Sequence, residues 1–281
     1  MGLRIGGLLR LIHPFPSILD GVVVGAVALI AGGDGLTAAR LAVSMTALQA
    51  SIGSLNDLVD APRDAGHKPG KPIPAGLVST RVAATAVALG AGIGIGLAIP
   101  SGWGTVALAV IVLAIGHGYD LRFKGTAWSW LPFAVGIPLL PVYGWLGAVG
   151  SLPVSFAILL PVAVLAGTAL AIANARADME RDAQAGVDSV AIRLGSGRAW
   201  AVNAGLLGVV VVASVTTLLN TGPPPGALVG AAAATLVLGL GLAIGRHGDG
   251  IGRERAWELQ AVGLGLLALA WLAGFPLDGG R

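Results

Sequence analysis

The sequence has no cysteine, and it is poor in charged and aromatic residues. Of its 281 residues none is Cys, 11% are Asp, Glu, Lys or Arg, and 5% are Phe, Trp or Tyr. The absence of thiols excludes disulfides, a thiol nucleophile and Cys-ligated zinc. Soluble domains carry about 25% charged residues, so this chain, with less than half that share, is not a typical soluble domain.

Apolar residues take the place of the missing charges. They make up 55% of the chain, and the mean hydropathy is +0.85. A membrane-spanning helix needs about 20 consecutive apolar residues. We find nine such runs, and we interpret the first as a retained span because no small-residue cleavage site follows it. The predicted spans are 14–33, 36–58, 80–99, 103–119, 127–147, 153–175, 198–219, 225–245 and 255–275.

These runs predict an all-α fold, a polytopic membrane bundle of about nine transmembrane helices around a central cavity. We expect one domain over residues 1–281, with polar cap loops at about 60–79 and 176–197. Gly is abundant, with 45 residues, and it occurs within the spans, where small residues let helices approach closely. Four prolines in the fifth and sixth spans predict kinks, namely Pro132, Pro138, Pro141 and Pro161.

The basic residues are distributed unevenly over the loops. With nine spans, only Arg40 and Arg281 of the 17 Lys and Arg residues fall on the face opposite the N-terminus. Cytoplasmic loops carry the excess of Lys and Arg. We therefore predict an integral protein of the cell membrane with its N-terminus and active-site loops in the cytoplasm. No aromatic-interleaved basic stripe is present, so membrane lipid is the expected partner and nucleic acid is not.

The scarce acidic residues are concentrated in two related motifs. Asp57, Asp60 and Asp64 lie within nine positions, although the whole chain has only 14 acidic residues. Their spacing of i, i+3 and i+7 would place all three carboxylates on one face of a helix. The pattern Asn-x3-Asp-x3-Asp begins at Asn56 and recurs at Asn174, with Asp178 and Asp182. The recurrence predicts an internal pseudo-repeat of two four-helix halves plus one helix.

Each acidic motif closes a long apolar run and precedes a Gly-containing polar loop. An accidental cluster of acids on a solvated helix end is the alternative interpretation, and the recurrence makes it less attractive. A carboxylate at the bilayer centre costs on the order of 2.5–3.5 kcal/mol, so the five aspartates should face a polar cavity. Oxygen ligands at this density suit a hard divalent cation, most plausibly Mg²⁺.

The loops beside the two motifs supply candidate phosphate ligands. Lys68 and Lys71 follow the first motif and could hold phosphate oxygens, or they could be ordinary cytoplasmic charge. Tyr119 could present a hydroxyl to the cavity, with Arg122 or Lys124 paired to phosphate, or these residues could be interfacial. The four histidines are scattered without zinc spacing, and we interpret them as interfacial.

Together these features indicate a diphosphate held through Mg²⁺ above an apolar chamber. The chemistry that needs such a site is ionisation of an allylic diphosphate. Metal ions neutralise the charge that builds on the leaving group. Loop cations add electrostatic stabilisation, and exclusion of water protects the carbocation.

Nearly the whole chain resembles the UbiA superfamily of intramembrane prenyltransferases. Asn56-Asp57-x2-Asp60-x3-Asp64 is similar to the family's first Asp-rich motif, and Asp178-x3-Asp182 to its second. Tyr119-x4-Lys124 is similar to the Tyr/Lys element between the fourth and fifth helices, and Arg10-x3-Pro14 to the opening of the first. The resemblance implies a nine-helix bundle with cytoplasmic Asp clusters.

The resemblance also implies a role for each motif residue. Asp57, Asp60 and Asp64 would coordinate one Mg²⁺, and Asp178 and Asp182 a second. Asn56 would orient the first cluster, with Asn174 at the matching place in the second, and Tyr119 would line the reaction chamber. The residues implied to contact the diphosphate are Arg63, Lys68, Lys71 and Lys124.

The chain departs from its relatives at Lys71-Pro72, where many have Arg-Pro, and at Arg181, where many have Gly. The expected reaction transfers a polyprenyl group from its diphosphate to a hydrophobic acceptor, either an aromatic ring or a lipid-like alcohol. Terpene cyclisation and phosphoribosyl transfer onto a lipid phosphate are alternatives. A transporter fits less well, because the two motifs end on the same predicted face.

Overall fold

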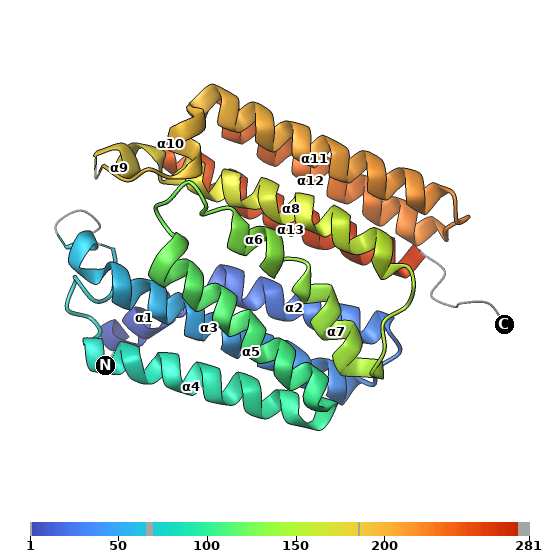
Figure 1. The fold of residues 1–281 in the computed structure, drawn as a ribbon, viewed down its shortest axis with the longest axis horizontal. Helices are drawn as coiled ribbons and strands as arrows, with labels where there is room; N and C mark the ends of the chain where they lie inside the picture. The colour runs from blue at the N-terminus through green and yellow to red at the C-terminus, as the bar shows by residue number, and fades with distance from the viewer. Residues whose placement is uncertain (1, 66–69, 185, 275–281) are drawn as a thin grey trace. The chain divides into compact units, whose positions relative to one another are not determined.

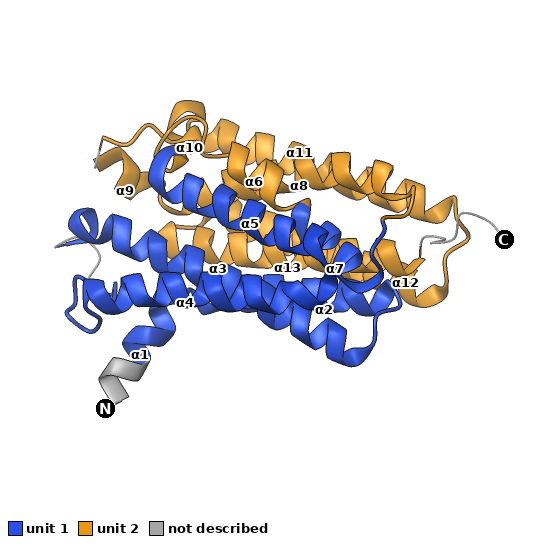
Figure 2. Cartoon of the chain, turned by 60° about the horizontal axis from the view of Figure 1, so that its bottom comes forward, with its two compact units in different colours: residues 1–122, 139–151 blue, residues 123–138, 152–281 orange. Residues whose placement is uncertain are grey.

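The structure is a computed structural model that describes residues 2–65, 70–184 and 186–274. Every regular element in these ranges is helical, as the sequence predicts (Figure 1). The chain forms two compact units, residues 1–122 with 139–151 and residues 123–138 with 152–281 (Figure 2). Each unit therefore takes its helices from two separate parts of the chain.

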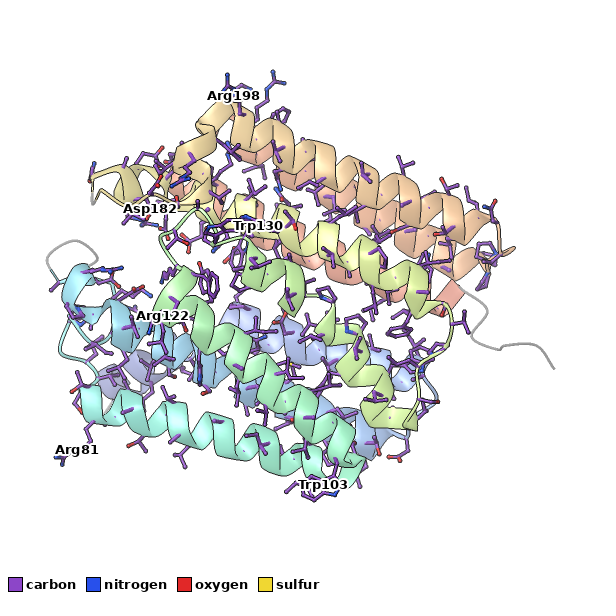
Figure 3. All side chains as sticks on the ribbon, in the orientation of Figure 1. Arg81, Trp103, Arg122, Trp130, Asp182 and Arg198 are labelled. Carbon is purple, nitrogen blue, oxygen red and sulfur yellow. The ribbon has the colours of Figure 1, made fainter. Side chains whose placement is uncertain are left out.

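Unit 1 holds the N-terminal helices and one helix from the middle of the chain. Its elements are α1 (Gly2–Leu11), α2 (Pro14–Ile30), α3 (Gly35–Asp64), α4 (Thr80–Ala98), the 3₁₀ turn Ile99–Ser101, α5 (Trp103–Gly118), most of the π-helix Tyr119–Phe123, and α7 (Leu139–Val149). Arg81 at the start of α4 and Trp103 at the start of α5 mark opposite ends of this unit (Figure 3).

Unit 2 holds the C-terminal helices. Its elements are α6 (Leu131–Gly136), α8 (Phe156–Ala177), the short α9 (Met179–Gln184) and α10 (Val190–Leu194), α11 (Ser196–Leu219), α12 (Pro225–His247) and α13 (Gly250–Gly274). The helices α8, α11 and α13 pack against one another, and α12 packs mainly along α13.

Seven helical segments of the described chain are long and apolar enough to cross a membrane. They correspond to seven of the nine predicted spans and identify an integral membrane protein. The other two predictions fall on α2, which is apolar but only 17 residues long, and on α3, which is not among the seven. The count of nine is therefore approximate, and the central cavity stays a prediction.

Helix α3 is the most polar of the long helices, and its polar residues are tolerated because other helices surround it. It packs against α1, α2, α4, α5 and α7. Ser44 donates to the Gly94 carbonyl of α4 at 2.6 Å, and its hydroxyl lies 2.6 Å from the Tyr143 hydroxyl of α7. Ser51 donates to the Val87 carbonyl at 2.8 Å. Polar groups inside a membrane protein are tolerated where neighbouring helices satisfy them.

Glycines set the spacing between α3 and its neighbours. A Cβ atom on Gly90 of α4 would lie 2.7 Å from the Ala47 carbonyl oxygen of α3. A Cβ atom on Gly21 of α2 would clash with the Thr46 hydroxyl of α3. These close approaches fix the depth and rotation of α3, and with them the direction in which its polar side chains point.

The fifth predicted span, 127–147, is broken into two helices. Helix α6 ends at Gly136, Ile137 and Pro138 follow, and α7 begins at Leu139. Proline cannot continue the hydrogen-bond pattern of a helix, which explains the interruption. The two pieces pack in different units, α6 against α8 and α7 against α2.

Candidate active site

The first Asp-rich motif forms the last turns of α3, which continues unbroken to Asp64. Asp57, Asp60 and Asp64 are only 2%, 6% and 5% exposed. At 100° per residue, Asn56 and the three aspartates fall within an arc of about 100°. The carboxylates therefore share one helix face, in agreement with their spacing.

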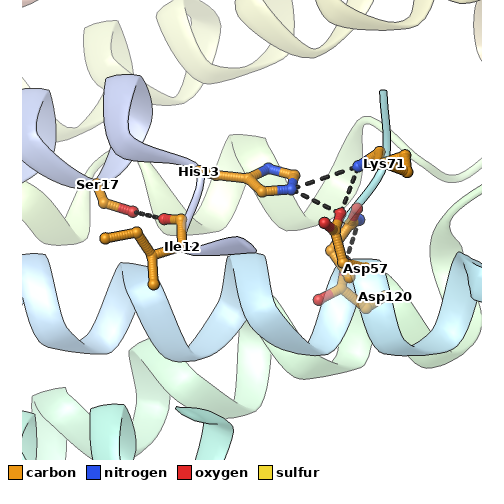
Figure 4. Close-up of polar contacts among 7 residues, drawn as sticks. Ile12, His13, Ser17, Asp57, Lys71 and Asp120 are labelled. Carbon is orange, nitrogen blue, oxygen red and sulfur yellow. Dashed lines mark hydrogen bonds and ion pairs between the residues drawn. The ribbon is translucent and has the colours of Figure 1, made fainter. Parts of the chain in front are cut away.

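Asp57 is held by two cationic or polar partners that are distant in sequence (Figure 4). His13 Nε2 lies 2.8 Å from Asp57 Oδ1, and the Lys71 ammonium donates to the same oxygen. Lys71 Nζ also lies 3.4 Å from His13 Nε2. Asp57 Oδ2 is buried and receives no hydrogen bond from the described residues. One oxygen of this carboxylate is thus engaged by the protein, and the other is not.

His13, interpreted from the sequence as interfacial, also contacts the first motif. It joins α1 to α2, immediately before Pro14, with a φ angle of +47°. No other described non-glycine residue has a positive φ angle. Strained backbone is found where the surrounding structure fixes it, often at a functional site. The only sequence signal for this residue is its place within the Arg10-x3-Pro14 element.

A small apolar cluster brings Lys71 to the motif. Leu11, Val78 and Ala83 form its buried centre, and Leu58, Ile73 and Leu77 pack around it. The loop after α3 is thereby fastened to α1 and to the motif helix itself. Arg10 Nη1 also donates to the Gly70 carbonyl at 3.5 Å. Lys68 lies outside the described residues, and the Arg63 side chain is exposed.

Asn56 is oriented by a residue that sequence reasoning did not select. Its Nδ2 donates to Asp120 Oδ1 at 2.8 Å, and Asp120 is 6% exposed. Because the amide nitrogen faces Asp120, the Asn56 carbonyl oxygen points elsewhere, and it accepts no hydrogen bond from the described residues. Asp120 lies on the π-helix at the end of α5, a kind of element frequent at functional sites.

The same π-helix carries Tyr119, which is partly buried in unit 1. Arg122, on the next turn, is exposed near the motif end of unit 1 (Figure 3). Lys124 follows directly in the chain, belongs to unit 2 and is partly buried. The predicted Tyr/Lys element therefore spans the passage of the chain from one unit to the other.

The second Asp-rich motif has a different local structure. Helix α8 ends at Ala177, Asp178 is its C-cap, and α9 starts at Met179. The two aspartates therefore do not share one uninterrupted helix, unlike those of the first motif. An i to i+4 hydrogen bond from the Asp182 amide to the Asp178 carbonyl, at 2.8 Å, still connects them. Arg181 donates to the Asp178 carboxylate. Both aspartates are partly exposed, and Figure 3 shows Asp182 on α9.

Two buried arginines tie this motif to the rest of unit 2. Arg176 is 3% exposed, and its Nη2 donates to the Gly245 carbonyl of α12 at 3.0 Å. Arg253 of α13 is 7% exposed and donates to Glu180, which lies between the two aspartates. Burial is the largest single influence on the pKa of Glu180 and raises it, but the hydrogen bond from Arg253, a backbone hydrogen bond and the charges of Arg253 and Arg181 together lower that pKa. These contacts position α9 against α13.

Asn174 has no counterpart of the Asn56–Asp120 bond. Among the described residues its amide forms no hydrogen bond with another side chain, and it is partly buried. Across residues 2–65, 70–184 and 186–274, no group of three or more His, Asp or Glu side chains is gathered tightly enough to hold a metal ion. Within each motif, cations from the chain itself lie against one of the carboxylates.

The sequence profile of the UbiA prenyltransferase family matches residues 21–264 of the chain. No curated protein matches it.

Several solved structures share the fold. A UbiA homologue from Aeropyrum pernix K1, in its apo form, is 20% identical over 89% of this chain and 94% of its own, with a TM-score of 0.74. A UbiA homologue from Archaeoglobus fulgidus, bound to GPP and Mg²⁺, is 18% identical over 95% and 99%, with a TM-score of 0.72. A structure from work on digeranylgeranylglyceryl phosphate synthase is 18% identical over 96% and 98%, with a TM-score of 0.69. At these identities the likeness concerns the fold.

Proposed function

The chain belongs to the UbiA prenyltransferase family, and from that premise we propose the reaction it performs. It moves a polyprenyl group from an allylic diphosphate to an aromatic or lipid-like acceptor in a Mg²⁺-dependent reaction within the membrane. The C1–O bond of the donor breaks and pyrophosphate leaves. The acceptor atom bonds to C1 and loses a proton.

The observation that carries this proposal is the burial of three aspartates at the end of α3. Carboxylates are costly in an apolar bundle, and such groups are functional candidates by default. Asp60 and Asp64 are carboxylates on the face of α3 that also carries Asn56, and Asn56 keeps an oxygen without a hydrogen bond from the described residues. Such a donor set suits Mg²⁺, which prefers oxygen ligands and few carboxylates.

We assign one Mg²⁺ to Asn56, Asp60 and Asp64, with Asp57 contributing through its unengaged Oδ2, and a second to Asp178 and Asp182. When bound, the ions supply charge neutralisation for the leaving diphosphate. Homologues from Archaeoglobus fulgidus have been solved with DMAPP or GPP and Mg²⁺, which supports the choice of ligand and ion. The number of ions is part of the proposal.

Lys71 is the cation best placed to receive the diphosphate. An ammonium has three N–H donors. Asp57 and His13 lie in reach of two of them, which leaves one for a phosphate oxygen. Arg63, Lys68 and Lys124 complete the proposed diphosphate ligands. Tyr119 lines the chamber, and Asn174 takes the place in the second motif that Asn56 has in the first.

We further propose that the N-terminus and both motif loops face the cytoplasm. The distribution of the 17 Lys and Arg residues over the loops supports this orientation. Accessibility of single cysteines introduced into this naturally Cys-free chain, probed from each side of sealed vesicles, tests it. Labelling of a cysteine at position 70 from the outside only would overturn it.

The reaction is tested by release of pyrophosphate from geranyl, farnesyl and geranylgeranyl diphosphate by the purified protein. Membrane-lipid extract serves as the acceptor pool, and products are identified by mass spectrometry. We expect release with Mg²⁺, none with EDTA, and an adduct that carries the prenyl group. A cyclised hydrocarbon without adduct would indicate a cyclase instead, and no release from any of the three donors would refute the proposal.

Asp60→Asn has a matched control at the other end of the same helix. Asp34 is the exposed N-cap of α3, where its side chain accepts from the Leu36 and Thr37 amides. Asn caps helices about as well as Asp, so Asp34→Asn removes one charge and preserves the helix. We expect Asp60→Asn to lower turnover by roughly 10²–10³ or more and Asp34→Asn to leave it within about twofold.

A further inference from the structure

A carboxylate outside both Asp-rich motifs lies inside unit 1. Asp20 is the only ionisable residue of α2, Pro14–Ile30, and it is partly buried. Gln49 of α3 is the only side-chain amide between residues 35 and 55. Its Nε2 donates to Asp20 Oδ2 at 2.7 Å. A single carboxylate–amide pair thus stands in an otherwise apolar part of the bundle.

Asp20 points away from the face of α2 that is free to meet lipid. Ile18, Val22 and Leu29 form an exposed stripe on this helix, at 56%, 58% and 55% exposure. With 100° per residue, Asp20 lies about 180° around the helix from the centre of that stripe. The close approach of α2 and α3 at Gly21, the next residue, brings the Asp20 side chain within reach of Gln49. The pair therefore faces the interior of unit 1.

The pair keeps hydrogen-bond acceptors that the described protein does not use. Asp20 Oδ1 and Gln49 Oε1 receive no hydrogen bond from any described residue, and neither oxygen is sealed from solvent. No described Lys, Arg or His forms an ion pair with Asp20. A hydrogen bond between two helices does not require this charge, because Asn or Ser would serve as well. The unused acceptor atoms of the pair suggest a ligand.

The pair lies on the same side of α3 as the first Asp-rich motif, but deeper along the helix. Gln49 precedes Asn56 by seven residues, about 10 Å along the helix axis and within about 20° around it. If the diphosphate lies at the motif, as the proposed function requires, an acceptor held by the pair would approach the donor from deeper along α3. A carboxylate and an amide oxygen accept hydrogen bonds and repel anions.

We propose that Asp20 and Gln49 bind the acceptor and select one with a neutral hydrogen-bond-donating head, a phenol or an alcohol, over one with a carboxylate or phosphate. The pair holds the hydroxyl group of the acceptor while the motif holds the donor. This inference rests on the proposed function and narrows its acceptor class.

The test measures binding of four probes to the purified protein by calorimetry in detergent with Mg²⁺ and without donor. The probes form two matched pairs, 4-methylphenol with 4-hydroxybenzoate and a 1-O-alkylglycerol with its 3-phosphate. We expect the neutral member of at least one pair to bind the wild type more tightly than the anionic member, by about tenfold or more, because like charges at close range are strongly unfavourable. Equal or reversed affinities in both pairs would overturn the inference.

Asp20→Asn separates selection from helix pairing. The Asn side chain can still accept from Gln49, so an interhelical role is preserved, but the charge is lost. We expect the affinity ratio within the pair to fall by about tenfold, with the KM for the prenyl diphosphate unchanged. An unchanged ratio, or a variant that no longer folds, would assign the pair a structural role and overturn the inference. Pyrophosphate release by the wild type is measured in parallel, since only its absence speaks against the proposed function itself.

Discussion

The two Asp-rich motifs have the same spacing in the sequence and different structures. In unit 1, the motif lies on an unbroken helix, and its three carboxylates are at most 6% exposed. Its partners His13, Lys71 and Asp120 come from three other elements. In unit 2, the helix ends at Ala177, just before Asp178. The aspartate side chains are partly exposed, and the partner of Asp178 is Arg181, three residues away.

The unit 1 motif is therefore held by residues distant in sequence, whereas Asp178 in unit 2 is paired with a neighbour in the sequence. Long-range partners fix the rotation and depth of the unit 1 carboxylates before any ligand arrives. In unit 2 the contact to the Asp178 carboxylate is local, and the long-range hydrogen bond from Arg253 reaches Glu180 between the two aspartates and not their carboxylates. We therefore expect substitutions of partner residues in unit 1 to damage both stability and turnover, and substitutions in unit 2 to act mainly on turnover.

The largest difference between the two units is expected when the cation beside the first motif, Lys71, is removed. Lys71→Met leaves Asp57 buried, with His13 as its remaining partner, whereas the Arg181–Asp178 pair is largely exposed. We expect Lys71→Met to lower the free energy of unfolding by about 1–3 kcal/mol and turnover by roughly 10²-fold or more. Thermal unfolding in detergent and pyrophosphate release measure the two effects.

A double variant separates the two losses for Lys71. With Asp57→Asn added, no buried charge is left unpaired, so stability should return towards that of the wild type while turnover stays low. A Lys71→Met protein as stable as the wild type would show that the unit 1 motif is not held by this contact.

Asp120 offers the next largest effect, and it has no counterpart in unit 2. Asp120→Leu removes the acceptor that orients the Asn56 amide. Outer-shell partners of this kind are worth about 10–100-fold in metal affinity or activity, so we expect a loss in this range and a raised Mg²⁺ requirement. Asp120→Asn can still accept from Asn56 and should retain most of the activity. Equal losses in both variants would contradict an orienting role.

The contact between Glu180 and Arg253 should give a smaller effect in unit 2. Arg253→Met removes the hydrogen bond between α9 and α13, and Asp182 on α9 loses part of its support. We expect kcat/KM to fall by about tenfold, because small displacements of binding groups are costly. Glu180→Gln keeps an acceptor for Arg253 and should stay within about threefold. Thermal stability and kcat/KM are measured together, and a loss of stability as large as that of Lys71→Met would remove the contrast between the units.

The spacing of aspartates was sufficient to predict the motifs because helical periodicity is a local property. Asp57, Asp60 and Asp64 share a face on any unbroken helix. The break at Asp178 was missed, since a C-cap depends on where the helix stops packing and not on the positions of two acids. The family and the all-α fold followed from the combination of motifs and apolar runs.

Partners from distant parts of the chain could not be predicted from the sequence. His13 lies 44 residues from Asp57, and Asp120 lies 64 from Asn56, so neither pairing leaves a periodic signal. Helix α3 illustrates the converse problem. Ser44, Ser51 and Gln49 lower its apolar character, yet each donates a hydrogen bond to a neighbouring helix. Composition alone does not distinguish a helix surrounded by protein from one that meets lipid.

Arg181→Met should produce the smallest effect of these variants, and it tests the cation beside the second motif. Arg181 is 51% exposed and its partner Asp178 is 37% exposed, so their ion pair adds little stability, about 0–1 kcal/mol at most. Many relatives have Gly at this position, as the resemblance indicates. Without Arg181, the Asp178 carboxylate no longer has to exchange one cation for another when Mg²⁺ binds. We therefore expect the Mg²⁺ concentration for half-maximal activity to fall by about two- to threefold at unchanged thermal stability.

Arg193→Met, which removes an exposed ion pair with Asp188 outside the motif, is the matched control and should leave the Mg²⁺ dependence unaltered. A Mg²⁺ requirement that rises in Arg181→Met would mean that this arginine helps to hold the diphosphate. Arg181 would then have the role in unit 2 that we propose for Lys71 in unit 1.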